Sequence, residues 1–133
     1  MALTKTKTDL VGSESGGTIT YESVAGAGTF PSTLTRRDVT GKIGLAFIFN
    51  VSYGASAPAT RPKLEIFTAA IDDADLQDTE AYETVEINTT TNAVKQITIP
   101  IRFAEDIRYI SWKVTNGTTN AAGFYVAIIE TSL

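Results

Sequence analysis

The pattern that most constrains the fold is a two-residue period of large apolar residues in residues 42–53, with Gly44, Ala46, Ile48 and Asn50 on the other face. The large apolar residues occupy every second position: Ile43, Leu45, Phe47, Phe49 and Val51. Successive side chains of a β-strand point to opposite faces of a sheet, so these five share one face. A strand with so continuous an apolar face belongs at the centre of a packed core.

The same two-residue period returns along the rest of the chain, separated by segments rich in Gly, Pro, Asn and Thr. Further strands are predicted at 18–24, 63–68, 82–88, 94–103, 107–115 and 123–131. Pro100 requires an edge position or a bulge for its strand, because proline has no N–H to donate to a neighbour. About seven or eight strands without a convincing helix predict an all-β protein, an antiparallel β-sandwich of jelly-roll-like type.

A chain of 133 residues is the size of one domain. Residues 1–17 are polar and end in Ser-Glu-Ser-Gly-Gly, a composition typical of flexible segments. We therefore predict a flexible N-terminal arm at 1–17 and a β-sandwich domain at 18–133.

The chain contains no histidine and no cysteine. The commonest general base, the commonest metal ligand and the strongest side-chain nucleophile are therefore missing from it. We predict a protein that is not an enzyme, with no catalytic residues, no cofactor and no metal site.

The formal net charge is −4, and no basic stripe offsets it. Because phosphate neutralisation supplies most non-specific affinity for nucleic acid, we predict no nucleic-acid partner. No run approaches the roughly 20 apolar residues that span a bilayer, and the polar N-terminus lacks the apolar core of a secretory signal. We expect synthesis in the cytoplasm and no membrane association.

Seven acidic residues and no basic residue lie between Ile71 and Glu86: Asp72, Asp73, Asp75, Asp78, Glu80, Glu83 and Glu86. Counted from Asp73, an EF-hand loop requires Gly at its sixth position and Glu at its twelfth. Those positions hold Asp78 and Thr84, so the calcium-loop pattern fails. We interpret the stretch as a solvated loop between strands.

Two carboxylates across a cleft can hydrolyse a glycosidic bond. The glutamates considered for such a pair are Glu22, Glu65, Glu83, Glu86, Glu105 and Glu130. Nothing in their spacing selects a pair, and none is assigned a catalytic role.

Trp112, the single tryptophan, falls on the same face of its strand as Ile110 and Val114, which predicts a core position. Tyr109 falls on the opposite face and is the better surface aromatic. An aromatic platform for stacking sugars, built from Tyr109, Tyr125 or Trp112, is the alternative interpretation.

Residues 63–131 carry a recognisable succession of strands: Lys-Leu-Glu-Ile-Phe-Thr, Tyr-Glu-Thr-Val-Glu-Ile-Asn, Val-Lys-Gln-Ile-Thr-Ile-Pro-Ile, Arg-Tyr-Ile-Ser-Trp-Lys-Val-Thr-Asn-Gly and Phe-Tyr-Val-Ala-Ile-Ile-Glu. This succession resembles the small β-sandwich structural proteins of tailed-bacteriophage particles, of the capsid-decoration, head-fibre or tail-accessory kind. The resemblance is one of strand texture and transfers no functional residue.

The resemblance implies a non-enzymatic virion structural protein that acts through protein–protein contacts. Its expected partners are further copies of itself, with a trimer favoured, and a capsid or tail protein. Its expected location is the virion, after synthesis in the host cytoplasm, and residues 1–17 are the expected docking arm. A carbohydrate-binding β-sandwich module is the alternative function.

Overall fold

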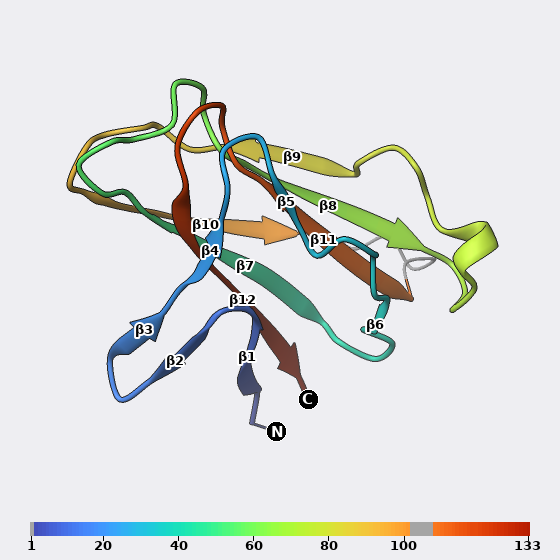
Figure 1. Cartoon of the computed structure of the whole chain (residues 1–133). Helices are drawn as coiled ribbons and strands as arrows, with labels where there is room; N and C mark the ends of the chain where they lie inside the picture. The colour runs from blue at the N-terminus through green and yellow to red at the C-terminus, as the bar shows by residue number, and fades with distance from the viewer. Residues whose placement is uncertain (1, 102–107) are drawn as a thin grey trace.

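The computed structural model describes residues 2–101 and 108–133, and within them the chain is all-β (Figure 1). Five of its twelve strands have three residues or fewer, so seven longer strands form the framework. The elements in chain order are β1 (Thr4–Val11), β2 (Ser13–Ser15), β3 (Thr18–Thr20), β4 (Glu22–Val24), β5 (Thr29–Phe30), β6 (Arg37–Asp38), β7 (Gly44–Ser52), β8 (Lys63–Ala69), the 3-10 helix η1 (Ala74–Leu76), β9 (Glu83–Glu86), β10 (Val94–Ile101), β11 (Tyr109–Thr115) and β12 (Ala122–Ser132).

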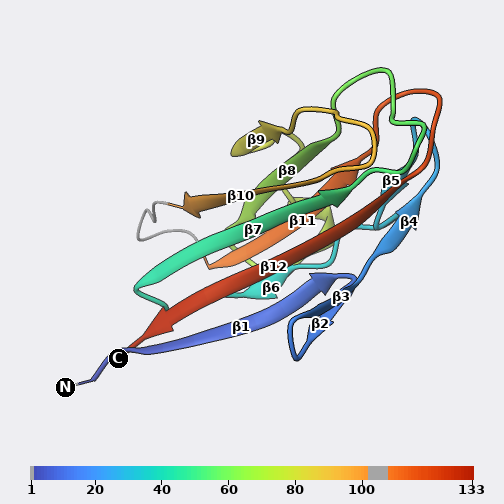
Figure 2. The ribbon, with the colours of Figure 1, turned by 90° about the vertical axis from the view of Figure 1, so that its left-hand side faces the viewer.

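Two five-stranded sheets pack face to face as a sandwich, and every strand pair in them is antiparallel. The first sheet has the order β1-β12-β7-β10, with β4 also paired to β12; Figure 2 shows these strands side by side. The second sheet has the order β5-β11-β8-β9, with β6 also paired to β11. A separate hairpin joins β2 and β3. The prediction of an all-β antiparallel sandwich is confirmed.

The core lies between the sheets and is built from the inward faces of their central strands. The first sheet contributes Phe47, Phe49 and Val51 from β7 and Phe124, Val126 and Ile128 from β12; the second contributes Leu64 and Ile66 from β8 and Ile110, Trp112 and Val114 from β11. The rings of Phe49 and Phe124 stack with centroids 6.2 Å apart. Burial of these side chains is the main stabilising term of the fold.

The predicted central strand is confirmed: β7 lies between β12 and β10, with Leu45, Phe47, Phe49 and Val51 buried. Ile43 differs from the prediction. The strand begins at Gly44, and Ile43 is 52% exposed. Its backbone N–H donates to the Thr131 carbonyl at 2.8 Å, near the end of β12.

β10 pairs only with β7 among the described strands, so Pro100 lies in an edge strand as expected. Ile99 and Ile101 are buried and Ile97 is partly buried against the core. Phe103, predicted on the same face, and Ile107, the predicted start of the following strand, lie outside the described residues.

The N-terminal segment differs from the flexible arm predicted at 1–17. Thr4 to Val11 form β1, which pairs in antiparallel register with β12 from Thr4 opposite Ser132 to Val11 opposite Val126. β12 is eleven residues long, and β1 satisfies backbone groups along an edge that would otherwise be unpaired. Residues 13–17 belong to the β2–β3 hairpin.

Candidate functional site

The β2–β3 hairpin, residues 13–20, projects from the edge of the first sheet (Figure 1). Its turn is Gly16-Gly17, and both residues have positive φ, +60° and +87°. A two-residue turn with positive φ at both positions matches the twist of paired strands, and glycine adopts it without steric cost. The two glycines therefore close a defined hairpin.

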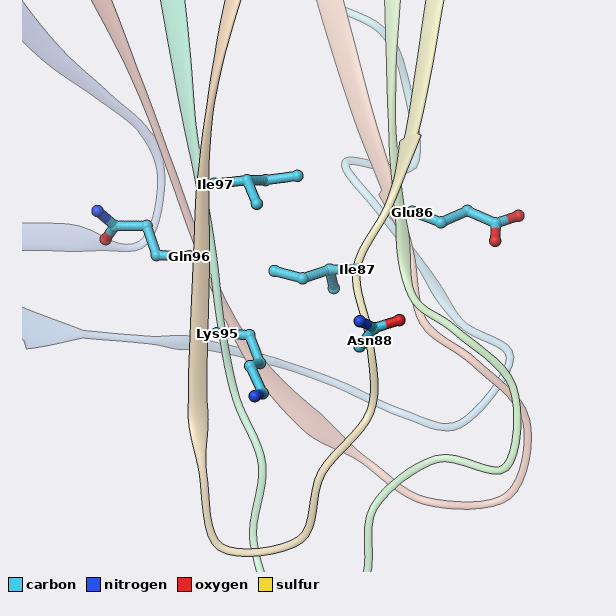
Figure 3. A pocket seen from close by; sticks show the side chains of 6 residues that line it. All are labelled: Glu86, Ile87, Asn88, Lys95, Gln96 and Ile97. Atoms are coloured by element: carbon cyan, nitrogen blue, oxygen red, sulfur yellow. The ribbon is translucent and has the colours of Figure 1, made fainter.

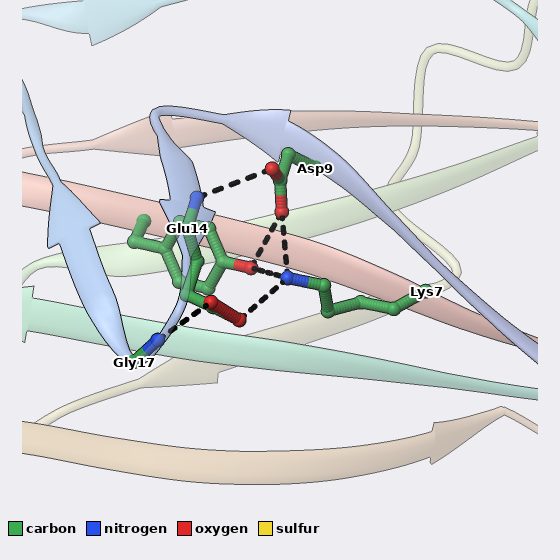
Figure 4. Close-up of polar contacts among 5 residues, drawn as sticks. Lys7, Asp9, Glu14 and Gly17 are labelled. Atoms are coloured by element: carbon green, nitrogen blue, oxygen red, sulfur yellow. Dashed lines mark hydrogen bonds and ion pairs between the residues drawn. The ribbon is translucent and has the colours of Figure 1, made fainter.

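A cluster of four side chains ties this hairpin to the sheet, and we call Lys7, Asp9, Glu14 and Tyr125 the hairpin cluster (Figure 4). Lys7 Nζ lies 2.8 Å from Glu14 Oε1 and 3.4 Å from Asp9 Oδ1. Tyr125 donates its hydroxyl proton to Asp9 Oδ1 at 2.6 Å. The carboxylates also accept backbone N–H groups of the hairpin: Glu14 N–H to Asp9 at 3.2 Å and Gly17 N–H to Glu14 at 3.3 Å.

The hairpin cluster holds its groups in their ordinary charge states at neutral pH. The hydrogen bond from Tyr125 lowers the pKa of Asp9, and Lys7 lowers the pKa of Glu14. Glu14 raises the pKa of Lys7, while burial raises that of Tyr125. A lysine that keeps its proton is neither a base nor a nucleophile, so this arrangement suits a structural ion cluster.

A polar row continues from the hairpin across the outer face of the first sheet. Tyr21 donates to Asn50 Oδ1 at 2.8 Å, and Asn50 donates to Gln96 Oε1 at 2.8 Å. Tyr21 lies so close over Gly123 that a Cβ at that position would stand 2.8 Å from the tyrosine's own Cβ. The chain leaving the hairpin is thus pressed against the sheet.

The acidic segment, residues 71–86, is exposed at most of its positions, as expected of a solvated loop, and side-chain contacts also hold it against the second sheet. Arg36 Nε lies 2.8 Å from Asp72 Oδ1. Gln77 donates to the Thr68 carbonyl at 3.3 Å and accepts from Ser111 at 3.2 Å, while Thr68 Oγ1 donates to Asp78 at 2.9 Å. Ser111, on the outer face of β11, is 1% exposed.

A small pocket opens between the edge strands of the two sheets, lined by Glu86, Ile87, Asn88, Lys95, Gln96 and Ile97; we call it the edge pocket (Figure 3). Ile87 and Ile97 point toward each other across it, and Lys95 also points into the gap, whereas Glu86 and Gln96 point away. Its volume of about 170 Å³ is below the roughly 300–1,000 Å³ of small-molecule sites. It suits a single aliphatic side chain.

The three aromatic residues of the sugar-platform interpretation are not brought together. Trp112 is in the core, 9% exposed, as its strand position predicted. Tyr125 is buried on the outer face of the first sheet, where its hydroxyl group belongs to the hairpin cluster. Tyr109 is half-buried on β11 of the second sheet.

The glutamates considered for catalysis are spread over several strands. Glu22 lies on β4, Glu65 on β8, Glu83 and Glu86 on β9, and Glu130 on β12. Glu105 lies outside the described residues. Within residues 2–101 and 108–133, no group of three or more acidic side chains is placed to hold a metal ion. In the same residues no helix is long and apolar enough to cross a membrane.

Sequence reasoning missed both the hairpin cluster and the edge pocket. The Gly-Gly pair between Ser15 and Thr18 was an available signal for the hairpin. The position of Ile87 opposite Ile97 depends on how β9 and β10, strands of different sheets, are placed. No sequence signal reports that contact.

No protein-family model matches the chain, and no curated protein matches it in sequence. Among solved structures, the chain is similar to one from Bacillus endospore appendages, reported as a family of disulfide-linked pili: 11% identity, TM-score 0.45, covering 99% of this chain and 88% of that one. It is also similar to the K3 and K1 adhesin domains of Lys-gingipain from Porphyromonas gingivalis W83. For K3 the identity is 14% and the TM-score 0.48, over 97% of this chain and 91% of that one. For K1 the values are 11% and 0.40, over 96% of each. At these values the likenesses carry no functional conclusion for this chain.

Proposed function

We propose that this chain is a non-enzymatic structural subunit that associates with itself and docks on a larger assembly through protein–protein contacts. The observation that carries the proposal is the projecting hairpin at residues 13–20, which the hairpin cluster fixes to the first sheet. An element that already has its bound shape loses little conformational freedom when it docks. In this proposal the hairpin makes the docking contact that was expected of a flexible arm at residues 1–17.

The assembly we favour is the particle of a tailed bacteriophage, with this chain as a capsid-decoration or cement subunit. The support is the resemblance of residues 63–131 to such proteins, together with a two-sheet scaffold whose core is continuous between the sheets. Separation of Tyr109, Trp112 and Tyr125 leaves the carbohydrate-binding alternative without its stacking platform.

The first test is the absolute mass of the full chain in solution, by size-exclusion chromatography with light scattering over a range of concentrations. We expect a closed trimer or a larger ring, because symmetric closure limits growth and matches a lattice. A monomer of 14.2 kDa at every concentration would contradict self-association.

The second test removes the hairpin alone. Residues 13–20 are replaced by two glycines, and the variant is compared with the full chain for attachment to the phage particle. Attachment is expected to be lost while the circular dichroism of the sandwich is retained. Undiminished attachment would contradict the docking role of the hairpin.

A further inference from the structure

One leucine of the acidic segment is displayed to solvent in a fixed position. Leu76 ends the 3-10 helix η1, the coiled ribbon at the right of Figure 1, and is 59% exposed. We propose that Leu76 of one copy inserts into the edge pocket of a second copy, and that Asp75 beside it pairs with Lys95 in that pocket. This inference rests on the self-association proposed above and names the contact that produces it.

Contacts of the residues on both sides of Leu76 hold the backbone that carries this side chain. Asp73 caps η1 by accepting the backbone N–H of Asp75 at 2.9 Å. Gln77, the next residue, is held by the Thr68 carbonyl and Ser111. A rigid apolar side chain exposed on a surface costs less ordering to bury at an interface than a mobile one.

The edge pocket sets a positive charge beside a small apolar recess, which matches the pairing of Asp75 with Leu76, the knob of this contact. Ile87 and Ile97 face each other across the gap; Ile87 is 4% exposed and belongs to the core, and the partly buried Ile97 completes the small apolar part of the lining. Lys95 points into the same gap and supplies a positive charge opposite the acidic surroundings of Leu76. Opposite charges beside an apolar contact orient the partners and exclude a reversed arrangement.

The knob and the pocket lie at opposite ends of β9, since η1 precedes this strand and the pocket follows it (Figure 1). A contact between two different surfaces is heterologous: each copy offers one knob and one pocket. Such contacts close into a ring when the rotation between copies permits it, and otherwise continue as a filament. Among closed rings larger than a dimer, the expected trimer is the smallest that this contact can build.

The test measures the dissociation constant of self-association by sedimentation equilibrium on the full chain. Leu76→Ser and Lys95→Glu are each expected to raise it roughly tenfold or more, because each removes one half of the contact. Restoring the opposite charges in the double variant Asp75→Lys with Lys95→Glu is expected to recover much of the loss of Lys95→Glu. Higher salt should weaken the wild-type association through the Asp75–Lys95 pair.

Leu3→Ser and Lys5→Glu are the matched controls, since Leu3 is 58% exposed and Lys5 is an exposed lysine outside the proposed contact. They should leave the dissociation constant unchanged. Leu76→Asp provides a second substitution at the knob, and thermal unfolding verifies that each variant is folded. If the wild type associates and the Leu76 and Lys95 variants associate equally well, this contact is wrong and self-association stands. If the wild type is always monomeric, both proposals fall.

Discussion

At the scale of single residues, Glu130 is a buried carboxylate whose charge the fold compensates with an ion pair. It lies on the inward face of β12 and is 4% exposed. Arg37 of β6, in the opposite sheet, meets it with two hydrogen bonds of 2.6 and 3.2 Å and donates a third, of 3.2 Å, to Thr8 of β1. A buried carboxylate is tolerated only when its charge is paired and its oxygens are hydrogen-bonded. This ion pair therefore links the two sheets.

Removing Arg37 alone should be more damaging than removing both partners. Arg37→Ala leaves a buried, unpaired carboxylate and is expected to lower the free energy of unfolding by about 3 kcal/mol, the low end for such pairs because Arg37 itself is partly exposed. The double variant Arg37→Leu with Glu130→Leu is expected to lose less. Urea unfolding followed by circular dichroism measures both, and a double variant as unstable as the single one would contradict the argument.

At the scale of elements, charged side chains hold the β2–β3 hairpin in its position. Its strands have three residues each, and the hydrogen bonds of the hairpin cluster are among the contacts that hold it to the sheet. Asp9 and Glu14 have pKa values lowered below their ordinary 3.8 and 4.5. A carboxyl with a lowered pKa contributes stability above its ordinary pKa and loses it as the pH falls.

Acid is therefore expected to loosen the hairpin before the sandwich unfolds. The contribution of Asp9 and Glu14 is complete above about pH 4.5 and declines below it. The amides of Glu14 and Gly17 report it directly, because they donate to these carboxylates, and their NMR shifts and hydrogen-exchange protection should change in acid. In Lys7→Met the Glu14 transition should move up toward pH 4.5, and an unmoved transition would show that Lys7 does not hold the hairpin.

At the scale of the whole molecule, the N-terminal segment completes the first sheet. β1 pairs with residues 126–132 of β12, and β4 pairs with Ala122–Phe124, so together they cover one edge of that strand. Thr and Lys alternate along β1, and lysines on an edge strand oppose further pairing with other chains. Without this segment, β12 would become a long apolar edge.

Deleting residues 1–12 should expose that edge. We expect the midpoint of thermal unfolding to fall by at least about 5 °C, equivalent to a loss of roughly 1–2 kcal/mol for a chain of this size. Concentration-dependent aggregation should accompany it, because the freed edge of β12 can pair with other copies. Scanning calorimetry and light scattering measure the two effects. An unchanged midpoint would restore the interpretation of this segment as a loose arm.

The amino-acid sequence by itself determined the strand-rich class, the central strand around Phe47 and Phe49 and the core position of Trp112, and it restricted the strand containing Pro100 to an edge position or a bulge. Each follows from a local rule. A two-residue period assigns side chains to faces, and proline cannot donate to a neighbouring strand. These rules act within a few residues and leave a readable trace in the chain.

Only the tertiary structure decided the rest: the pairing of β1 with β12, the hold of the hairpin cluster, the seating of the acidic segment on the second sheet and the edge pocket between β9 and β10. β1 has no continuous apolar face from which a strand could be predicted. Its partner, β12, lies more than a hundred residues further along the chain. Ile97 in β10 and Ile87, the residue after β9, face each other because β9 and β10 are edge strands of two different sheets. Such contacts depend on which distant segments pair, and periodicity along the chain does not encode that choice.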